Sequence, residues 1–408
     1  MNKILTLCIL GILSITMLYG IDKNYSLDLK FYQNAYALDD TMDSISFGEL
    51  NTGTVAVNQQ TNLVYVTNFR NGTVSVIDGD SNDMIDFFKA GKTPFGLGIN
   101  EKTNMIYVGA EYNNTLYVIN GFTNTIEDSI EIKEPYDIAV DPNTNMVYVT
   151  SDGSKSVYAI DGNTNKIVKT FEVSDPCGIA VNTETDMIYV TSESTNKVHV
   201  IDSKKNEIVG IIDVSESPRG VIANPTTNMI YVTNQKANTV SIIDGSTNSV
   251  IDSIDVGDNP KRVVVNPESN IIYVTNQDSN SLSVINGSTN SVIGSIPVNS
   301  PFEMAINSDS NKIYTTFYGT GELTVIQGYV PGKQEITLSD NLPPIKQMKL
   351  GISSKEVTCD AGKELMFKNS DGAAACVKSE TVEKCVTPAH PRSAFYSLLS
   401  FRKQPGSP

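Results

Sequence analysis

One short stretch recurs along the chain at a fixed spacing, and this recurrence constrains the fold more than any other feature. The stretch is Asn228-Met-Ile-Tyr-Val-Thr-Asn234, and its tyrosine has counterparts 41 or 42 residues apart. The tyrosines are Tyr65, Tyr107, Tyr148, Tyr189, Tyr231, Tyr273 and Tyr314. A period of about 40 residues, filled with short β-type runs and turn signals, is typical of a propeller with four strands per blade. The sequence therefore predicts an all-β, seven-bladed β-propeller of four-stranded antiparallel blades.

The fifth repeat shows how four strands divide the period. Arg219-Gly-Val-Ile-Ala-Asn224 is the predicted first strand, and residues 229–233, 239–243 and 248–256 are the next three. These runs are rich in Val, Ile, Thr and Tyr and contain no internal proline, as strands require. Asp244-Gly245 predicts a tight hairpin turn whose two central positions have positive φ.

The second strand of each repeat is apolar on both faces. Ile230 and Val232 point to one side, and Met229 and Tyr231 point to the other. A sheet with one face in water would alternate apolar and polar residues. Each small sheet must therefore lie between two others, which radially stacked blades provide.

The two ends of the repeat region complement each other. The seventh repeat stops after Gln327-Gly328 without a clear fourth strand. Before the first repeat lies Met42-Asp-Ser-Ile-Ser-Phe47, which is similar to the fourth strand Ile251-Asp-Ser-Ile-Asp-Val256. We expect this N-terminal strand to complete the last blade and close the ring.

The motif at the end of the second strand carries a family resemblance. Tyr-Val-Thr-Asn at 65–68, 231–234 and 273–276, with its Asn-Pro-x-x-Asn and Asp-Gly-x-Thr-Asn turns, resembles the YVTN β-propeller repeats of archaeal surface-layer and bacterial periplasmic proteins. The resemblance covers residues 42–328, although Tyr107-Val-Gly-Ala110 and Tyr314-Thr-Thr-Phe317 lose the end of the motif. It implies an extracytoplasmic envelope protein. Related propellers include lyases, lactonases and quinoprotein dehydrogenase subunits.

The N-terminal residues 1–37 predict export. An apolar run at 4–19 follows Met1-Asn-Lys3, and Ala35-Tyr-Ala37 is a candidate cleavage site. The run is about as long as the apolar part of a signal peptide and short for a membrane span. Whether the segment is removed or kept as an anchor stays open, and we expect an extracellular, cell-surface or pseudo-periplasmic location.

The C-terminal part is predicted to be separate from the propeller. Residues 329–344 form a linker, 345–385 a small cysteine-containing module, and 386–408 a disordered tail. A disulfide between Cys359 and Cys376 would offset the thin core of so small a module. The module is similar to a short cysteine-paired one on exported proteins of ammonia-oxidising archaea.

Charge and histidine content narrow the range of functions. A formal net charge of −16 argues against nucleic acid or anionic membranes as general partners, so contact with a membrane is expected only through an N-terminal anchor. The two histidines, His199 and His390, are too few for a convergent metal site or for the usual catalytic bases. We therefore expect no cofactor, no metal and no catalytic residue. Cys177 is interpreted as a packing residue.

The mouth of the predicted central channel is the best candidate for a binding site. The residues that open the first strands differ from blade to blade, whereas a need for stability alone would favour similar ones. The predicted ligand-binding residues are Phe95, Tyr136, Asp137, Arg219, Lys261, Arg262, Phe302 and Glu303. Converging cations beside aromatic rings suggest an anion site. The alternative, equally weighted, is that the cations only pair with Asp137, Glu303 or Asp258.

These observations favour an exported, non-catalytic propeller that acts as a binding or adhesion scaffold at the cell envelope. The expected partner is a small anionic ligand, a glycan or an envelope protein. The alternatives are a lyase, a lactonase or a quinoprotein-dehydrogenase-like enzyme, and a structural surface-layer component. Asn71, Asn113 and Asn286 lie in sequons for N-glycosylation.

Overall fold

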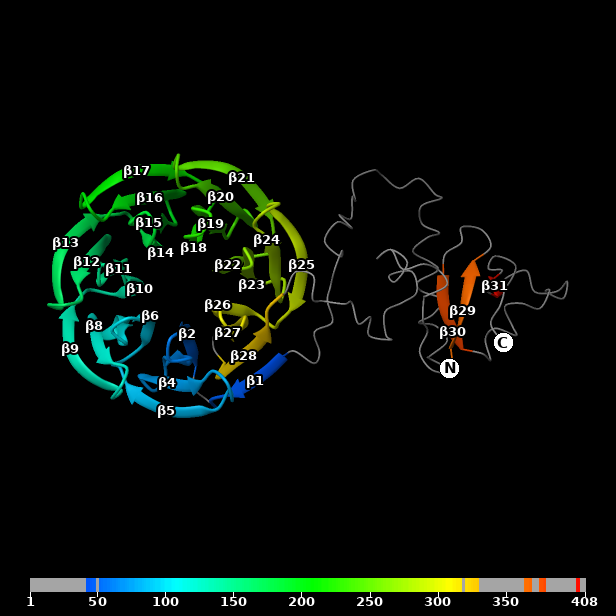
Figure 1. The fold of residues 1–408 in the computed structure, drawn as a ribbon, viewed down its shortest axis with the longest axis horizontal. Helices are drawn as coiled ribbons and strands as arrows, with labels where there is room; N and C mark the ends of the chain where they lie inside the picture. The colour runs from blue at the N-terminus through cyan, green and yellow to red at the C-terminus, as the bar shows by residue number, and fades with distance from the viewer. Residues whose placement is uncertain are drawn as a thin grey trace. The chain divides into compact units, whose positions relative to one another are not determined.

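Seven four-stranded sheets account for most of the structure. A computed structural model of the chain describes residues 42–48, 51–317 and 320–329, and the backbone of three later strands. The chain divides into two compact units, Met1–Gly328 and Tyr329–Pro408, at the boundary predicted between propeller and linker. The seven sheets of the first unit stand around a central axis (Figure 1). The seven-bladed, all-β propeller is therefore confirmed.

Each blade contributes one antiparallel sheet. Blade 1 holds β2 (Thr52–Asn58), β3 (Leu63–Asn68), β4 (Thr73–Asp78) and β5 (Met84–Lys89). Blade 2 holds β6 (Pro94–Asn100), β7 (Met105–Ala110), β8 (Thr115–Asn120) and β9 (Thr125–Glu131). Blade 3 holds β10 (Pro135–Asp141), β11 (Met146–Ser151), β12 (Ser156–Asp161) and β13 (Lys166–Glu172). Blade 4 holds β14 (Pro176–Asn182), β15 (Met187–Ser192), β16 (Lys197–Asp202) and β17 (Glu207–Asp213).

The remaining blades follow the same order. Blade 5 holds β18 (Pro218–Asn224), β19 (Met229–Asn234), β20 (Thr239–Asp244) and β21 (Ser249–Asp255). Blade 6 holds β22 (Pro260–Asn266), β23 (Ile271–Asn276), β24 (Ser281–Asn286) and β25 (Ser291–Pro297). Blade 7 holds β26 (Pro301–Asn307), β27 (Lys312–Phe317), β28 (Glu322–Gln327) and β1 (Met42–Ser46). The first strand of each blade lines the centre, and the last forms the rim (Figure 1).

The N-terminal strand closes the ring, as the sequence predicts. β1 pairs antiparallel with β28, from Met42 opposite Ile326 to Ser46 opposite Glu322. The backbone N–H of Phe47 then donates to the carbonyl of Gly321 at 2.7 Å. Blade 7 is therefore built from both ends of the repeat region, and the rim has no gap at the junction.

The hydrophobic core lies between the blades. Ile230 and Val232 pack into a cluster shared by blades 4 and 5. Tyr231, between them in sequence, packs into the cluster shared by blades 5 and 6. The two apolar faces of the second strand are thus buried against two different neighbours, which is why one repeat alone could not hide them.

The polar end of the motif holds neighbouring strands together. The Thr233 hydroxyl accepts from the N–H of Gly220 at 2.8 Å and donates to the carbonyl of Lys261, in the next blade, at 2.9 Å. The amide of Asn234 donates to the hydroxyls of Thr239 and Ser241 in the next strand at 3.0 and 2.9 Å. The threonine therefore links blades, and the asparagine links strands within a blade.

The predicted two-residue turn at Asp244-Gly245 is wrong, although the hairpin itself is present. β20 ends at Asp244 and β21 begins at Ser249, so four residues join them. The positive φ belongs to Asn248, at 52°. Gly245 is needed for a different reason, because a Cβ there would lie 2.4 Å from the Oδ1 of Asn228.

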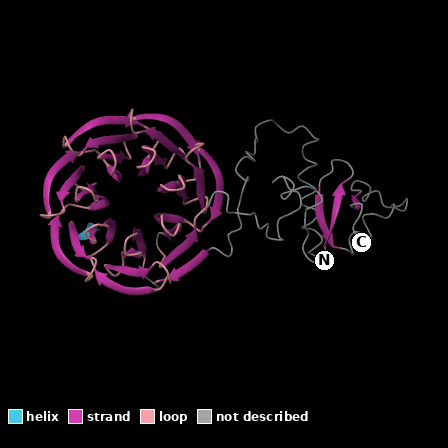
Figure 2. Cartoon of the chain, in the orientation of Figure 1, coloured by secondary structure: helices cyan, strands magenta, loops and turns pink. Residues whose placement is uncertain are grey.

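Little else is regular in the described residues. They contain one short 3-10 helix, η3 (Glu111–Asn113), between β7 and β8 (Figure 2). No helix among them is long and apolar enough to cross a membrane. The second unit contains β29 (Lys363–Lys368), paired with β30 (Ala374–Lys378) and with β31 (Phe401–Lys403), which falls in the predicted tail. Residues 1–37 and Cys359 lie outside the described residues, so the predicted leader and disulfide stay predictions.

Candidate functional site

The first strands reach the channel mouth through a bulge. Pro260 pairs with Asn276 and Val263 with Val274, so Lys261 and Arg262 together face the single residue Thr275. The Thr275 hydroxyl accepts from the backbone N–H of Arg262 at 2.8 Å and fixes this irregularity. Bulges of this kind re-aim side chains. The same register shift follows the opening residue of every first strand.

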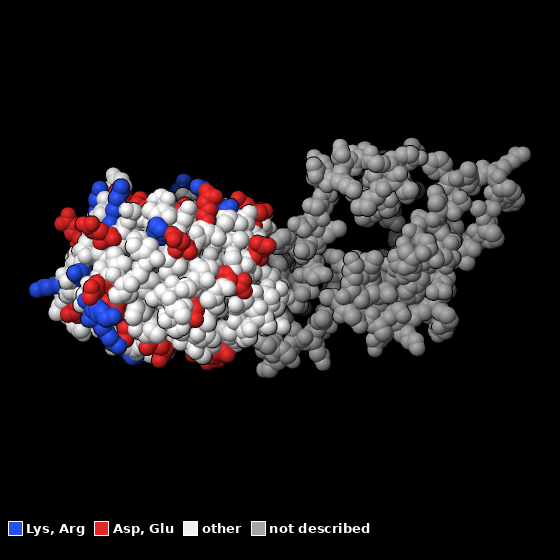
Figure 3. Space-filling model, turned by 90° about the horizontal axis from the view of Figure 1, so that it is seen from above, with Lys and Arg blue, Asp and Glu red and all other residues white. Residues whose placement is uncertain are grey.

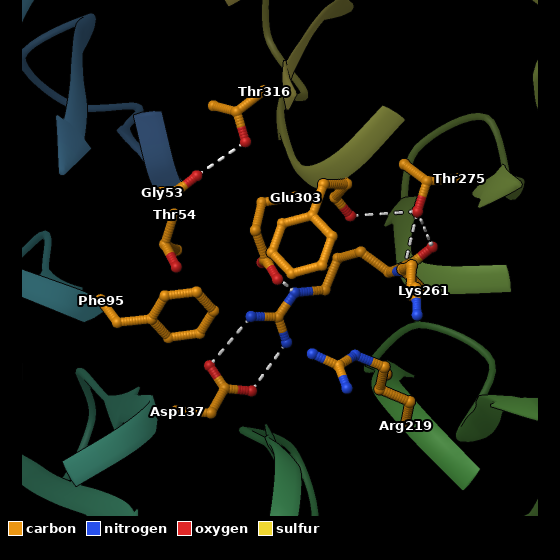
Figure 4. Close-up of polar contacts among 12 residues, drawn as sticks. Gly53, Thr54, Phe95, Asp137, Arg219, Lys261, Thr275, Glu303 and Thr316 are labelled. Carbon is orange, nitrogen blue, oxygen red and sulfur yellow. Dashed lines mark hydrogen bonds and ion pairs between the residues drawn. The ribbon is translucent and has the colours of Figure 1, made fainter. Parts of the chain in front are cut away.

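Arg262 crosses the channel and is neutralised there. Its Nη1 and Nη2 lie 2.7 and 3.1 Å from the two carboxylate oxygens of Asp137 on blade 3. Its Nε donates to Glu303 on blade 7 at 2.5 Å. Asp137 and Glu303 are buried, and Figure 4 shows them converging from different blades. Arg262 therefore pairs with carboxylates, as the alternative interpretation of the cations expected.

This ionic network is strongly desolvated. Burial raises the pKa of Glu303, the positive charge of Arg262 opposes that rise, and the negative charge of Asp137 adds to it. Two carboxylates share one guanidinium, and the raised pKa of Glu303 favours a proton on this acid as the pH falls. The network links blades 3, 6 and 7 across the channel and leaves Arg262 with no charge to offer a ligand.

The aromatic residues gather as predicted, with one addition. The Phe95 ring stacks on Tyr136 with centroids 4.8 Å apart and meets Phe302 edge-on at 6.3 Å. Phe69 stacks on the other side of Phe95 at 5.4 Å, and the sequence analysis missed it. The signal was Gly53, where a Cβ would lie 3.2 Å from the Phe69 ring. In blade 1 the aromatic group thus comes from the loop after β3 instead of the first strand.

Arg219 lies against these rings. Its guanidinium is 5.9 Å from the centroid of Tyr136 and 5.6 Å from that of Phe302, within the range of cation–π attraction. Its Nη2 donates to the Tyr136 hydroxyl at 2.5 Å. The nearest carboxylate is Glu193, whose Oε2 is 3.7 Å from Nη1. The rings of Tyr136 and Phe302 position Arg219, and its Nη1 lies on the side of Glu193.

Lys261 is the second available cation. The residue is only 9% exposed, and no hydrogen-bond or ion-pair partner reaches its ammonium group among the described residues. Burial and, next in size, the positive charge of Arg219 together lower the pKa of Lys261 from 10.5 to about 8. Desolvating an ammonium group that has no protein partner is costly, so this position is unfavourable for the empty protein.

A small cavity joins these groups. Its volume is about 10 Å³, roughly the space for one water molecule. Its lining comprises Tyr136, Cys177, Gly178, Arg219, Lys261, Arg262 and Glu303. We refer to Arg219, Lys261 and this cavity as the Arg219–Lys261 site. The cavity is large enough for one oxygen atom of a ligand and too small to enclose a metabolite.

Cys177 is a wall of this cavity and is not an activated nucleophile. It is buried and not disulfide-bonded, and burial raises the pKa of its thiol to about 11. The thiolate needed for reactivity is therefore scarce at neutral pH. This agrees with its interpretation as a packing residue.

A larger hollow lies apart from the channel. It has a volume of about 360 Å³ and is lined by Thr93, Glu111, Tyr112, Asn114 and Glu134. Tyr112 is 71% exposed, and the ammonium group of Lys92 lies 5.2 Å from the centre of its ring. The irregular second blade, whose motif ends in Gly109-Ala110, builds this hollow with η3.

The candidate glycosylation residues occupy two environments. Asn71 and Asn113 are exposed in the loops that follow the second strands of blades 1 and 2. The side chain of Asn113 accepts from the N–H of Lys92 at 2.5 Å. Asn286 is half-buried at the end of β24 and accepts from the N–H of Ser288 at 2.8 Å, a turn role that needs no glycan. Modification at all three positions stays a prediction.

Comparison with known proteins supports the fold alone. No family model matches the chain, and no curated protein matches it. Among solved structures it is similar to hydrazine synthase of Kuenenia stuttgartiensis, with a TM-score of 0.63 and 14% identity. The similarity covers 70% of this chain and 98% of that one. The resemblance to YVTN repeats therefore stays a prediction.

Proposed function

We propose that this chain is an exported, non-catalytic propeller that binds an acidic group of its ligand at the channel mouth. The observation that carries the proposal is Lys261, a largely buried lysine whose ammonium group has no partner among the described residues, beside Arg219 in a cavity with room for about one water. A ligand oxyanion there would satisfy both cations. The aromatic rings of Phe302 and Tyr136 would contact the rest of the ligand.

The size of the cavity indicates how the ligand would bind. Only a terminal carboxylate, sulfate or phosphate oxygen fits, so the body of the ligand lies over the mouth. An acidic glycan and an acidic segment of an envelope protein both meet this requirement. Figure 3 shows acidic and basic side chains interspersed over one side of the propeller, so a strongly charged partner gains little from that side. Recognition would then depend on the mouth.

Binding of acetate, glucuronate and phosphate to the full chain, measured by calorimetry, tests this proposal. We expect binding that is lost in the double variant R219M/K261M and unchanged in K236M, which removes an exposed lysine. Binding should weaken as the pH rises through about 8, because the neutral amine of Lys261 no longer attracts an anion. Equal affinity in the double variant, or no binding of any of the three anions, would contradict the proposal.

An enzymatic role is the second candidate, and one observation favours it. A lysine with a pKa of about 8 is partly neutral near physiological pH and can act as a base or nucleophile. The hydrazine synthase similarity adds nothing here, since 14% identity shows fold alone. Metal analysis and an absorbance spectrum of the purified protein separate the candidates, because a bound chromophore or stoichiometric metal would favour the enzyme.

A further inference from the structure

We propose that Lys261 binds carbon dioxide reversibly as a carbamate. The inference deepens the proposed function, because it rests on the same Arg219–Lys261 site, and it names a reactant for the neutral form of the amine. Its basis is geometric. The residue is only 9% exposed, its ammonium group has no partner among the described residues, and it lines a cavity beside a guanidinium.

The reaction is balanced without any further reagent. The lone pair of the neutral Nζ attacks the carbon of CO₂ and forms a C–N bond. One electron pair of a C=O bond moves onto oxygen, and the proton of the N–H group leaves to solvent. The product is an N-carboxylate with one negative charge, and nothing is oxidised or reduced.

The positive charge of Arg219 favours this product. Arg219 is the charged neighbour that most strongly disfavours an ammonium at this position. Carboxylation replaces that repulsion with an attraction between the new carboxylate and the guanidinium. Glu193 and Asp278 act in the opposite sense and favour the ammonium, and Cys177 does so to a smaller extent. Desolvation is the largest influence and keeps the amine available as a nucleophile.

The size of the cavity and the charge of the product favour CO₂ over larger carbonyl compounds. A space of about 10 Å³ holds one oxygen atom of the N-carboxylate and leaves no room for the side chain of a larger aldehyde. An imine formed from an aldehyde would also present no negative charge to Arg219. The site therefore suits a reactant that is small when it enters and anionic once it has reacted.

The test is ¹³C NMR of the full chain in buffer containing ¹³C-labelled bicarbonate and CO₂. We expect a carbamate resonance, beyond that of the N-terminal amine, which grows as the pH rises through about 8 at a fixed CO₂ pressure. The resonance should be absent in K261M and K261R and unchanged in K236M. It should fall roughly tenfold in R219M, the usual effect of losing one charge-assisted hydrogen bond.

Trapping with an alkylating oxonium salt, followed by peptide mass analysis, locates the adduct independently of the spectrum. Adduct on a Lys261 peptide supports the inference. A resonance of equal size in K261M and the wild type, or no trapped Lys261 peptide, overturns it. K261R retains the positive charge, so its circular dichroism separates loss of the adduct from loss of the fold. Anion binding at low pH without a carbamate at high pH would overturn this inference and leave the proposed function intact.

Discussion

Lys261 and Arg262 are neighbours in sequence, yet the fold gives them opposite environments. Arg262 is held by two carboxylates from other blades, at 2.7 and 2.5 Å. Lys261, one residue earlier, has no such partner among the described residues and lines the cavity. The bulge in β22 turns both side chains toward the mouth, where each meets a different neighbour. Arg262 therefore links blades of the ring, whereas the charge of Lys261 lowers the stability of the folded protein.

The stability cost of Lys261 gives a pH-dependent prediction for K261M. The folded protein lowers the pKa from 10.5 to about 8, so between these values the unfolded chain binds more protons and stability rises with pH. Below about pH 8 the full penalty applies, at most about 3 kcal/mol. We expect K261M to be more stable than the wild type at pH 7 and to lose that advantage by about pH 10.

Urea unfolding at several pH values measures this difference. K236M, which removes a largely exposed lysine, is the control and should follow the wild type at every pH. A stability difference between K261M and the wild type that is the same at pH 7 and pH 10 would show that the ammonium group is not strained.

Asparagine pairs join neighbouring blades at the face opposite the mouth. The last residue of one first strand donates its amide to the asparagine before the second strand of the next blade. The pairs are Asn58–Asn104, Asn100–Asn145, Asn182–Asn228, Asn224–Asn270, Asn266–Asn311 and Asn307–Asn62. Between blades 3 and 4 the corresponding residues are Asp141 and Asp186, and no hydrogen bond joins them in the described part of the chain. Two carboxylates have no proton to share, so this contact between elements is missing.

Replacing Asp141 with asparagine should restore the missing contact. The new amide would donate to Asp186 in place of accepting from the Thr144 hydroxyl, as Asp141 does at 2.6 Å, while its oxygen still accepts from the N–H of Asn143, as Asp141 does at 2.9 Å. The expected gain is about 1 kcal/mol, or about 2 °C in Tm for a domain of this size. Thermal unfolding followed by circular dichroism measures it.

D161N is the matched control. Asp161 accepts from the N–H of Asn163 in a turn, and its carboxylate makes no hydrogen bond to another blade within the described residues, so its replacement should give no gain. Equal shifts in D141N and D161N would mean that removal of a negative charge, and not the interblade bond, is responsible.

At the scale of the whole molecule, the ring depends on the pairing of its two ends. β1 supplies the outer strand of blade 7, and Ile45 and Phe47 join the core cluster between blades 7 and 1. Without this strand, β28 would be an exposed edge. The Arg262 network, which links blades 3, 6 and 7 across the channel, would remain.

Truncation tests the closure. A chain that begins at Met42 should melt like the full chain, whereas one that begins at residue 49 should lose roughly 10 °C or more, because it loses the five residue pairs of β1 with β28 and part of a core cluster. Calorimetry of both truncated chains gives the comparison. Similar melting temperatures would mean that closure by β1 contributes little.

The sequence by itself determined the number of blades, the strand order and the closure by residues 42–47. These features follow from local patterns, namely a fixed period, alternation along each strand and a similarity between two short stretches. The residues of the mouth could be predicted for the same reason, since they hold equivalent positions in each repeat. The turn at Gly245 was predicted wrongly because glycine is needed there to make room for the side chain of Asn228, a residue distant in sequence.

Only the tertiary structure decided which mouth residues pair. Arg262 finds Asp137 at a separation of 125 residues, and nothing in either repeat encodes that contact. Phe69 entered the aromatic group because Gly53 leaves space for it. The repeat pattern determines the backbone position from which each side chain extends. The partner of that side chain across the axis is determined only when the ring closes, because closure brings the differing residues of seven blades together at the centre.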